Sequence, residues 1–379
     1  MKHLILLLIA ALLLAGCWNY REIDNLAIAL GLAVDKGEGD SYIVTVEIIN
    51  LEGAGPESEF KPTTVQAQSD TIFGAIRRLI TVTGKKLYWA HAKVVIISEE
   101  IAREGILPIL DFVQRDAEIR SDVWLLVSKE ETAAEILAST PLVESSISQQ
   151  LSQILQHHAP EPKSIPEELW NFMQKLTAPG IAPVIATVGL VEQGEEKLTR
   201  IKGVAFFRRD KMVGWLDGKE SLALSYLLNE SISGLIVLRY EESGLTAQIT
   251  YEVVGNKTEF QPFIKDDQIT MGIVTNLQVI LAEVANQKVD FSQPSVRSKL
   301  ESDLAEHLEE LMKRTIIKLQ QYNSDAVGLG SVLRRRDPEA WKLVADDWPA
   351  VFGSLQTDIR VKPVIRASAL VSKPIEMRD

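Results

Sequence analysis

The strongest constraint on the fold is a strict alternation of apolar and polar side chains over residues 245–253. Leu245, Ala247, Ile249, Tyr251 and Val253 are separated by Thr246, Gln248, Thr250 and Glu252. A period of two places the apolar set on one face of a strand, so this stretch predicts a strand with one buried and one wet face. Residues 258–265 and 268–283, joined by an Asp266-Asp267 turn, extend the prediction to an antiparallel sheet.

A long amphipathic helix is predicted to follow this sheet and to begin at Pro294. Its apolar residues recur at steps of three or four: Val296, Leu300, Leu304, Leu308, Leu311, Thr315, Leu319 and Tyr322. At 1.5 Å per residue the helix is about 40 Å long, and its single apolar stripe suits packing across the sheet. A coiled coil with a partner is the alternative. The last predicted strand is 358–366, so the C-terminal region is predicted to be α+β.

The first half of the chain mixes predicted strands and helices. Predicted strands lie at 26–34, 42–51, 63–69, 87–90, 93–97, 122–127 and 182–190. A helix lies between them, capped by Ser69 or Asp70 and ended by Gly84, and a second spans about 106–114. Residues 53–62 are rich in Gly, Pro and Glu and predict a loop. Residues 131–176 are predicted to be mostly helical.

A charged turn region at 191–200 marks the main predicted domain boundary. We predict a signal peptide at 1–16 that is removed and a mixed α+β N-terminal domain at 17–196, which includes the helical segment 131–176. The C-terminal α+β domain is predicted at 199–379, with an antiparallel sheet packed on the long helix and a further break near 230–245. A hairpin of 201–207 and 212–216 and a helix at 218–229 are predicted to open this second domain.

The N-terminus has the pattern of a lipoprotein signal peptide. A charged start is followed by an apolar run of about eleven residues, which suits a signal peptide and is short for a membrane span. Leu14, Ala15 and Gly16 precede Cys17, the sole cysteine, and resemble a bacterial lipobox. Cys17 is therefore predicted to carry a covalent diacylglyceryl lipid. A cleaved signal peptide before an ordinary thiol, or an uncleaved anchor helix, are the alternatives.

Composition and charge limit the classes of partner. The chain has 379 residues, a formal net charge of −12 and 46% hydrophobic residues, values of a globular protein. Such an acidic protein is a poor candidate for binding nucleic acid or an anionic membrane surface. We therefore expect attachment through the lipid and through specific partners. One cysteine permits no intramolecular disulfide, so the fold depends on packing.

Motifs for catalysis or cofactor binding are incomplete, so no catalytic, metal or cofactor site is predicted. Gly214–Lys219 is one residue short of a phosphate loop, and Glu220 replaces its Ser/Thr. His157 and His158 are adjacent and would point about 100° apart on a helix. Gly328-Leu329-Gly330 lacks the third glycine of a dinucleotide fingerprint and predicts a turn. No zinc-protease or nucleophile-elbow motif occurs.

A basic run at Arg334, Arg335 and Arg336 is the one local charge anomaly in this acidic chain. A solvated helix face explains most such runs. The functional alternative is contact with an acidic loop of a partner subunit, because a guanidinium pairs with a carboxylate in bidentate geometry.

The mature N-terminus carries a family resemblance. Cys17-Trp18-Asn19-Tyr20-Arg21-Glu22-Ile23, followed by Leu26-Ala27 and a strand ending in Asp35-Lys36, resembles the start of the Ger(x)C family, the lipoprotein C subunits of spore germinant receptors. Asn19 stands where Asp is frequent. Blocks at 202–207, 212–217, 220–221 and 361–366 extend the resemblance over essentially the whole chain.

The resemblance implies a non-catalytic subunit that works with integral-membrane A and B subunits. It implies a lipid anchor on the outer face of the cell membrane or of the inner spore membrane. A solute-binding lipoprotein that delivers a small molecule to a transporter is the alternative function. The short spacer between Cys17 and the first strand disfavours it, as does the lack of a long alternating βαβ series.

Overall fold

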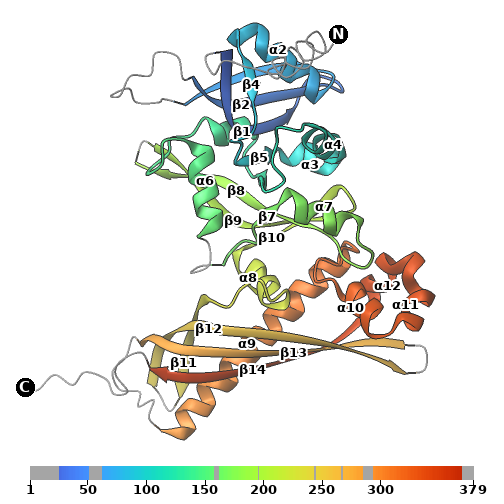
Figure 1. Ribbon diagram of the computed structural model, residues 1–379. Helices are drawn as coiled ribbons and strands as arrows, with labels where there is room; N and C mark the ends of the chain where they lie inside the picture. The colour runs from blue at the N-terminus through green and yellow to red at the C-terminus, as the bar shows by residue number, and fades with distance from the viewer. Residues whose placement is uncertain are drawn as a thin grey trace, which may run out of the picture.

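The computed structural model describes residues 25–50, 62–157, 162–194, 196–242, 245–265, 268–284 and 293–368. Two sheets carry the fold, one toward each end of the molecule (Figure 1). Mixed helices and sheets confirm the predicted α+β class. The predicted signal peptide at 1–16 and residues 53–61 of the predicted loop at 53–62 lie outside the described residues.

The first sheet is mixed and has ten strands among the described residues. Their bounds are β1 Leu26–Lys36, β2 Tyr42–Asn50, β3 Thr63–Ser69, β4 Lys86–Tyr88, β5 Val94–Ile97, β6 Trp124–Ser128, β7 Glu167–Glu168, β8 Val184–Gln193, β9 Glu196–Arg208 and β10 Lys211–Leu216. The main order is β10-β9-β8-β6-β5-β1-β2-β3, with β4 on β1 and β7 on β6. The central pairs β1–β5, β5–β6 and β6–β8 are parallel, and the outer pairs are antiparallel.

Helices cover both faces of this sheet. One face packs against α2 Ile72–Thr83, α3 Glu99–Glu104, α4 Leu107–Arg115 and α7 Leu169–Thr177. The other face packs against α5 Ala134–Leu137 and α6 Ile147–Gln156. Burial on both faces explains why the central strands are apolar runs without alternation, for example Val94–Ile97.

Buried carboxylates hold α5 and α6 on the sheet. Asp35 at the end of β1 accepts hydrogen bonds from the backbone N–H of Ala133 (2.5 Å) and Ala134 (3.0 Å), where α5 begins. Glu47 on β2 accepts from Ile147 N (3.0 Å) and Ser148 N (2.9 Å), at the start of α6. Free N–H groups at a helix start favour a negative partner, which stabilises both carboxylates against the cost of burial.

The cap of α2 differs from the prediction. Thr71 is the N-cap, with its Oγ1 accepting from Gly74 N at 3.0 Å, whereas Ser69 ends β3. Ser, Thr and Asp all serve as caps, so three consecutive candidates left the position open by one or two residues. Gly84 ends the helix in the left-handed conformation, as predicted.

The first sheet continues through the boundary predicted between 196 and 199. β8 pairs with β9 from Val184↔Phe206 to Gln193↔Glu196, and β10 pairs with β9. The hairpin that we assigned to the C-terminal domain thus forms the edge of the N-terminal sheet. The predicted charged turn at 191–200 is mostly strand, because both its arms continue the β8–β9 ladder.

The second sheet has the order β11-β12-β13-β14. Its strands are β11 Gly234–Glu242, β12 Leu245–Lys265, β13 Gln268–Val284 and β14 Gln356–Ser368. The first three are antiparallel, but β14 runs parallel to β13, which corrects the prediction of an all-antiparallel sheet. The chain returns between β13 and β14 through α9 Pro294–Gln321, α10 Leu329–Arg336, α11 Pro338–Val344 and α12 Trp348–Ser354, and such a crossover makes a parallel pair.

The predicted long helix, α9, packs along this sheet (Figure 1). Two of its glutamates also bind the edge strand: Glu309 Oε1 accepts from Val361 N and Glu301 Oε1 from Ile365 N, each at 2.9 Å. Eight residues of helix rise about 12 Å and four residues of strand about 13 Å, so the two spacings match. These bonds occupy edge N–H groups that would otherwise be open to another strand.

A buried junction joins the helical crossover to the first sheet. Asp325 Oδ1 accepts from Gly328 N (2.8 Å) and Leu329 N (3.0 Å), and Oδ2 accepts from Gly330 N (2.8 Å) and Trp348 Nε1 (2.9 Å). The backbone oxygen of Asp325 accepts from Ala182 N at 2.8 Å, two residues before β8. Gly328 is the N-cap of α10, where the sequence predicted a turn.

Two glycines let the backbones of this junction touch. Ser331 N donates to Gly180 O at 2.8 Å, and a Cβ on Gly180 would lie 2.5 Å from the carbonyl carbon of Gly330. A Cβ on Gly330 would lie 2.5 Å from the indole of Trp348. Side chains larger than hydrogen are therefore excluded at both positions.

Candidate functional site

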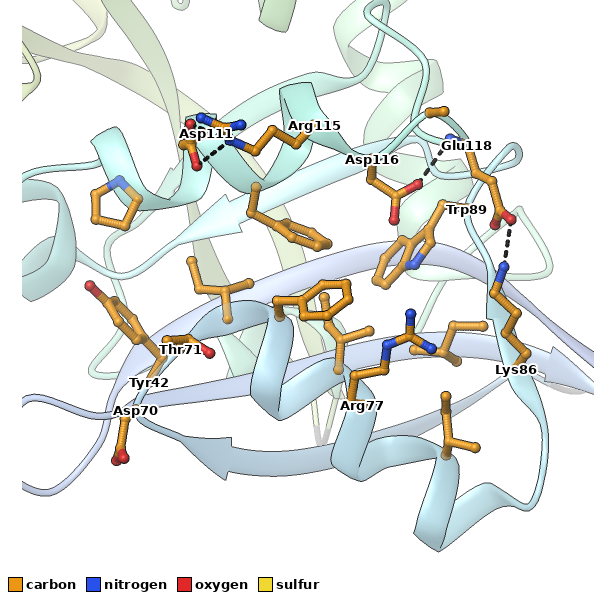
Figure 2. Close-up of a pocket in the computed structure, with 18 residues that line it drawn as sticks. Tyr42, Asp70, Thr71, Arg77, Lys86, Trp89, Asp111, Arg115, Asp116 and Glu118 are labelled. Atoms are coloured by element: carbon orange, nitrogen blue, oxygen red, sulfur yellow. Dashed lines mark hydrogen bonds and ion pairs between the residues drawn. The ribbon is translucent and has the colours of Figure 1, made fainter.

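The clearest concave site lies between α2 and α4, over β4, and has a cavity volume of about 690 Å³. We call it the α2–α4 groove. Figure 2 shows α2 on one wall and α4 with the turn after it on the other. The residues that line it are Tyr42, Asp70, Thr71, Ile72, Phe73, Ile76, Arg77, Ile80, Lys86, Leu87, Trp89, Pro108, Asp111, Phe112, Arg115, Asp116, Ala117 and Glu118.

Aromatic side chains form much of the apolar lining. Trp89 and Phe112 are buried, with ring centroids 6.3 Å apart in an edge-to-face contact. Phe73, on α2, is 51% exposed although it is large and apolar, and the Arg77 guanidinium lies 4.8 Å from its ring centroid. A wall with this composition suits an apolar or amphipathic group.

The charges on the α4 side are mostly held by ion pairs. Arg115 Nε lies 2.8 Å from Asp111 Oδ1, and Lys86 Nζ lies 2.7 Å from Glu118 Oε1. Asp116 Oδ1 accepts from Glu118 N at 2.9 Å, which fixes the turn after α4 (Figure 2). These contacts position the rim and assemble no nucleophile with a base, so the groove has the chemistry of a binding surface.

A buried carboxyl group with a strongly raised pKa lies in the first sheet, outside the groove. The side chain of Glu167, on β7, is fully buried and lies 2.8 Å from Lys175 Nζ. Burial raises the pKa of Glu167 to about 7, against the opposing effect of Lys175. Its Oε1 has no hydrogen-bond partner. Among the described residues, the other groups that act on Glu167 are the carboxylates of Glu230 and Glu168, which supply no nucleophile, so we assign the pair a structural role.

The lipobox prediction cannot be placed in the structure. Leu14, Ala15, Gly16 and Cys17 lie outside the described residues, so acylation of Cys17 stays a prediction. Within the described ranges, no helix is both long and apolar enough to cross a membrane. In the same part of the chain, no group of three or more His, Cys, Asp or Glu side chains is arranged to hold a metal ion.

The three arginines of the predicted partner face are exposed on the last turn of α10. Arg335 and Arg336 line a hollow of about 750 Å³ together with Lys257. Arg336 also borders a second hollow with Arg360 and Lys362. Among the described residues, no ion pair involves any of the three guanidinium groups. Arg336 already acts on Glu259 in the same hollow, because Lys257 and, more weakly, Arg336 lower the pKa of that carboxyl. Contact of the three arginines with a partner stays a prediction.

The incomplete phosphate-loop motif has a structural explanation. Gly214–Leu216 lies in β10, and Asp217 caps α8 Gly218–Leu227. Glu220 completes a capping box, with its Oε2 accepting from Asp217 N at 2.8 Å. The residue that replaces the required Ser/Thr is thus a helix-capping residue.

Sequence reasoning missed the α2–α4 groove, although one signal was present. The predicted apolar face of α2 contains Ile72, Ala75, Ile76, Leu79 and Ile80. Phe73 lies outside the center of that face and is therefore expected on the surface, which is common for a single apolar side chain and gives only a weak signal. The far wall, α4 and its following turn, could be paired with α2 only from the tertiary structure.

Comparisons with known proteins give two family matches in sequence order. Residues 19–190 match the model of the spore germination protein N-terminal domain, and residues 202–369 match the spore germination B3/GerAC-like C-terminal model. Spore germination protein KC of Bacillus subtilis is 23% identical, over 98% of this chain and 97% of its own. Spore germination protein B3 of the same species is 25% identical, over 92% of each chain.

A solved structure has the same fold. The crystal structure of the GerBC protein covers 90% of this chain and 100% of its own, with a TM-score of 0.55 and 23% identity. At that identity the similarity establishes the fold and leaves the activity to other evidence. Both halves of the chain are thus matched, together and in order.

Proposed function

This chain belongs to the Ger(x)C family of spore germination proteins, and on that premise we propose that it acts in spore germination as a lipid-anchored, non-catalytic receptor subunit. The observation that carries the proposal is the match of both family models, in order, over nearly the whole chain. Relatives named as spore germination proteins align over more than nine-tenths of their own length. We infer that its partners are the integral-membrane A and B subunits of a germinant receptor.

The anchor part of the proposal rests on the N-terminal sequence. Cys17 follows Leu14-Ala15-Gly16, and the first described residue is Asn25. Eight residues between Cys17 and Leu26 span at most about 27 Å. A domain on so short a spacer has a high effective concentration toward membrane partners, in the millimolar range for short linkers. Weak contacts then suffice for assembly.

Lengthening this spacer tests the proposal. Inserting about thirty Gly/Ser residues after Trp18 is expected to lower the effective concentration several-fold, because it falls roughly with the −3/2 power of linker length. Germination through this receptor and co-purification of the A and B subunits should both weaken. The control is an insertion of the same composition after Ser368, at the end of the last described strand. Wild-type germination and assembly with the extended spacer, at normal protein levels, would refute close tethering.

The exposed arginines of α10 provide the proposed partner face. Reversing Arg335 and Arg336 to glutamate is expected to reduce co-purification of the A and B subunits by about tenfold or more, since an interfacial charge reversal adds repulsion to the lost pairing. The matched control reverses two exposed basic residues of β9, Lys197 and Arg200. If both pairs of reversals weaken assembly equally, net charge is responsible and the α10 face has no specific role.

A further inference from the structure

The acidic charge of this chain is unevenly distributed, and α2 with its following turn is locally basic. Residues 72–86 contain Arg77, Arg78, Lys85 and Lys86 and no acidic residue, whereas the whole chain has a net charge of −12. Arg77 and Arg78 are exposed and lie about 100° apart on the solvent side of the helix. The helix therefore presents a positive ridge to solvent.

Two large apolar side chains flank this ridge. Phe73 is 51% exposed and Val82 is 67% exposed, whereas the opposite side of α2 is buried through Ile72, Ala75 and Leu79. We call Phe73, Arg77, Arg78, Val82, Lys85 and Lys86 the α2 face. The apolar side of α2 is packed on the protein, so the attraction to a bilayer would come from the basic side chains, which anionic lipids attract, with Phe73 and Val82 adding apolar contact on either side.

The α2 face lies close to the start of β1, which the spacer connects to the proposed anchor at Cys17. Leu26, the first residue of β1, pairs with Lys86 of β4, so the two Cα atoms are neighbours in the sheet. The Lys86 end of the α2 face is thus adjacent to the point where the spacer from Cys17 joins β1. Figure 1 shows α2 at the end of the molecule away from the second sheet and α9. A lipid on Cys17 would hold this end within about 27 Å of the bilayer.

We propose that the α2 face docks on the surface of an anionic phospholipid bilayer, with Arg77 and Arg78 against the headgroup phosphates and Phe73 and Val82 among the headgroups on either side of them. The proposal rests on the proposed lipid anchor, which brings this face to the membrane. The net charge alone predicted that this acidic chain would bind an anionic membrane surface poorly, and the proposal changes that expectation. At physiological salt, electrostatic interactions are screened beyond about 8 Å, so the charge closest to the bilayer decides the sign of the interaction. Of the carboxylates in the α2–α4 groove, Asp111 is ion-paired with Arg115, whereas Glu118 is ion-paired with Lys86 of the face itself. The positive charge that faces the bilayer therefore comes chiefly from Arg77 and Arg78.

The single cysteine makes a direct test possible. In the acylated full chain Cys17 is blocked, so Val82→Cys introduces the one reactive thiol for a nitroxide label. Leu343→Cys on α11, with a side chain 86% exposed, provides the matched site far from α2. The protein is reconstituted on vesicles of phosphatidylcholine alone or with 30% phosphatidylglycerol. Collisions of each label with a water-soluble nickel complex are then measured.

On the anionic vesicles, the label at position 82 is expected to be at least about threefold less accessible to nickel than the label at 343. On neutral vesicles the difference should largely disappear. Arg77→Glu with Arg78→Glu should abolish the protection, because each basic residue near an anionic surface contributes about a fivefold change in partitioning. Lys197→Glu with Arg200→Glu, at exposed positions of β9, changes the net charge equally and should leave the protection intact.

Three results would overturn docking. Equal accessibility at 82 and 343 on vesicles that carry the protein would refute the α2 face while leaving the anchor in place. Protection that requires the A and B subunits instead of anionic lipid would assign the face to a protein partner. A chain that fails to float with any vesicle would refute the anchor and the docking together.

Discussion

Replacing Asp325 by alanine is expected to lower the free energy of unfolding by about 3 to 5 kcal/mol. The Asp325 carboxylate accepts four hydrogen bonds, from the backbone N–H groups of Gly328, Leu329 and Gly330 and from Trp348 Nε1. Alanine would leave these donors unpaired in the buried junction between α10, α12 and the first sheet. Chemical denaturation of the chain measures the loss.

A second capping aspartate provides the matched control. Asp337 caps α11 by accepting from Ala340 N at 3.0 Å, and its side chain is only half-buried. Asp337→Ala is expected to cost about 1 kcal/mol, as for an ordinary N-cap. Equal losses for the two variants would show that Asp325 is no more than a helix cap.

The pH dependence of the free energy of unfolding tests the role of Asp325 independently. Burial raises the pKa of Asp325 to about 6, from an ordinary value of 3.8. The folded chain therefore binds a proton that the unfolded chain lacks between about pH 4 and pH 6. The contribution of this group to the free energy of unfolding is present below pH 4 and is lost as the pH rises through 6. The Asp325→Ala variant should lack that part of the pH dependence.

Cys17→Ala is expected to abolish membrane attachment of the mature chain. The thiol is the group that a diacylglyceryl lipid would modify, and the sequence has no second cysteine to replace it. Two acyl chains provide a stable anchor, whereas the described residues contain no helix able to span a bilayer. The protein should remain either unprocessed or released. Fractionation with mass spectrometry of the N-terminus distinguishes these states.

Cys17→Ser is a closer control, since it conserves size and polarity and should fail in the same way. A non-acylated chain that is still cut before position 17 and stays fully membrane-bound would contradict the anchor. The α2 face alone should not reach that result, because a weak electrostatic contact dissociates at high salt and a diacyl anchor does not.

Local periodicity predicted most elements, and their pairing was harder to predict. The alternation at 245–253 and the apolar stripe from Pro294 correspond to β12 and α9. The first strand of the second sheet, β11, was missed. Leu235 and Val237 on this strand are exposed, so its apolar residues do not alternate with polar ones.

The direction of β14 could not be predicted from its own residues. A parallel and an antiparallel edge strand have the same alternation, and only the path of the chain through α9 to α12 decides between them. The same limitation applies to β9, whose residues give no indication of which sheet it joins. Its two faces belong to different cores, with Ala205 and Phe207 in one and Val204 and Phe206 in the other.

One candidate site could be predicted from the sequence, and the other depends on the tertiary structure. The exposed run Arg334–Arg336 was predictable because a charge run depends only on sequence. The α2–α4 groove was not, since its walls are about 35 residues apart in the chain and meet only through β4 and β5. Phe73 was visible as an aromatic residue off the buried stripe of α2, but its neighbour Trp89 on the groove floor was not.

Because the first sheet is continuous, it limits where the N-terminal part of one family member can be joined to the C-terminal part of another. The two family models meet between residues 190 and 202, at the tip of the β8–β9 hairpin. A chimera joined there would pair β8 of one parent with β9 of the other, and Val184 would face a foreign Phe206. A crossover after Leu216, where β10 ends, keeps the whole sheet from one parent. Natural shuffling of these proteins should therefore favour breakpoints near α8 over the sequence boundary.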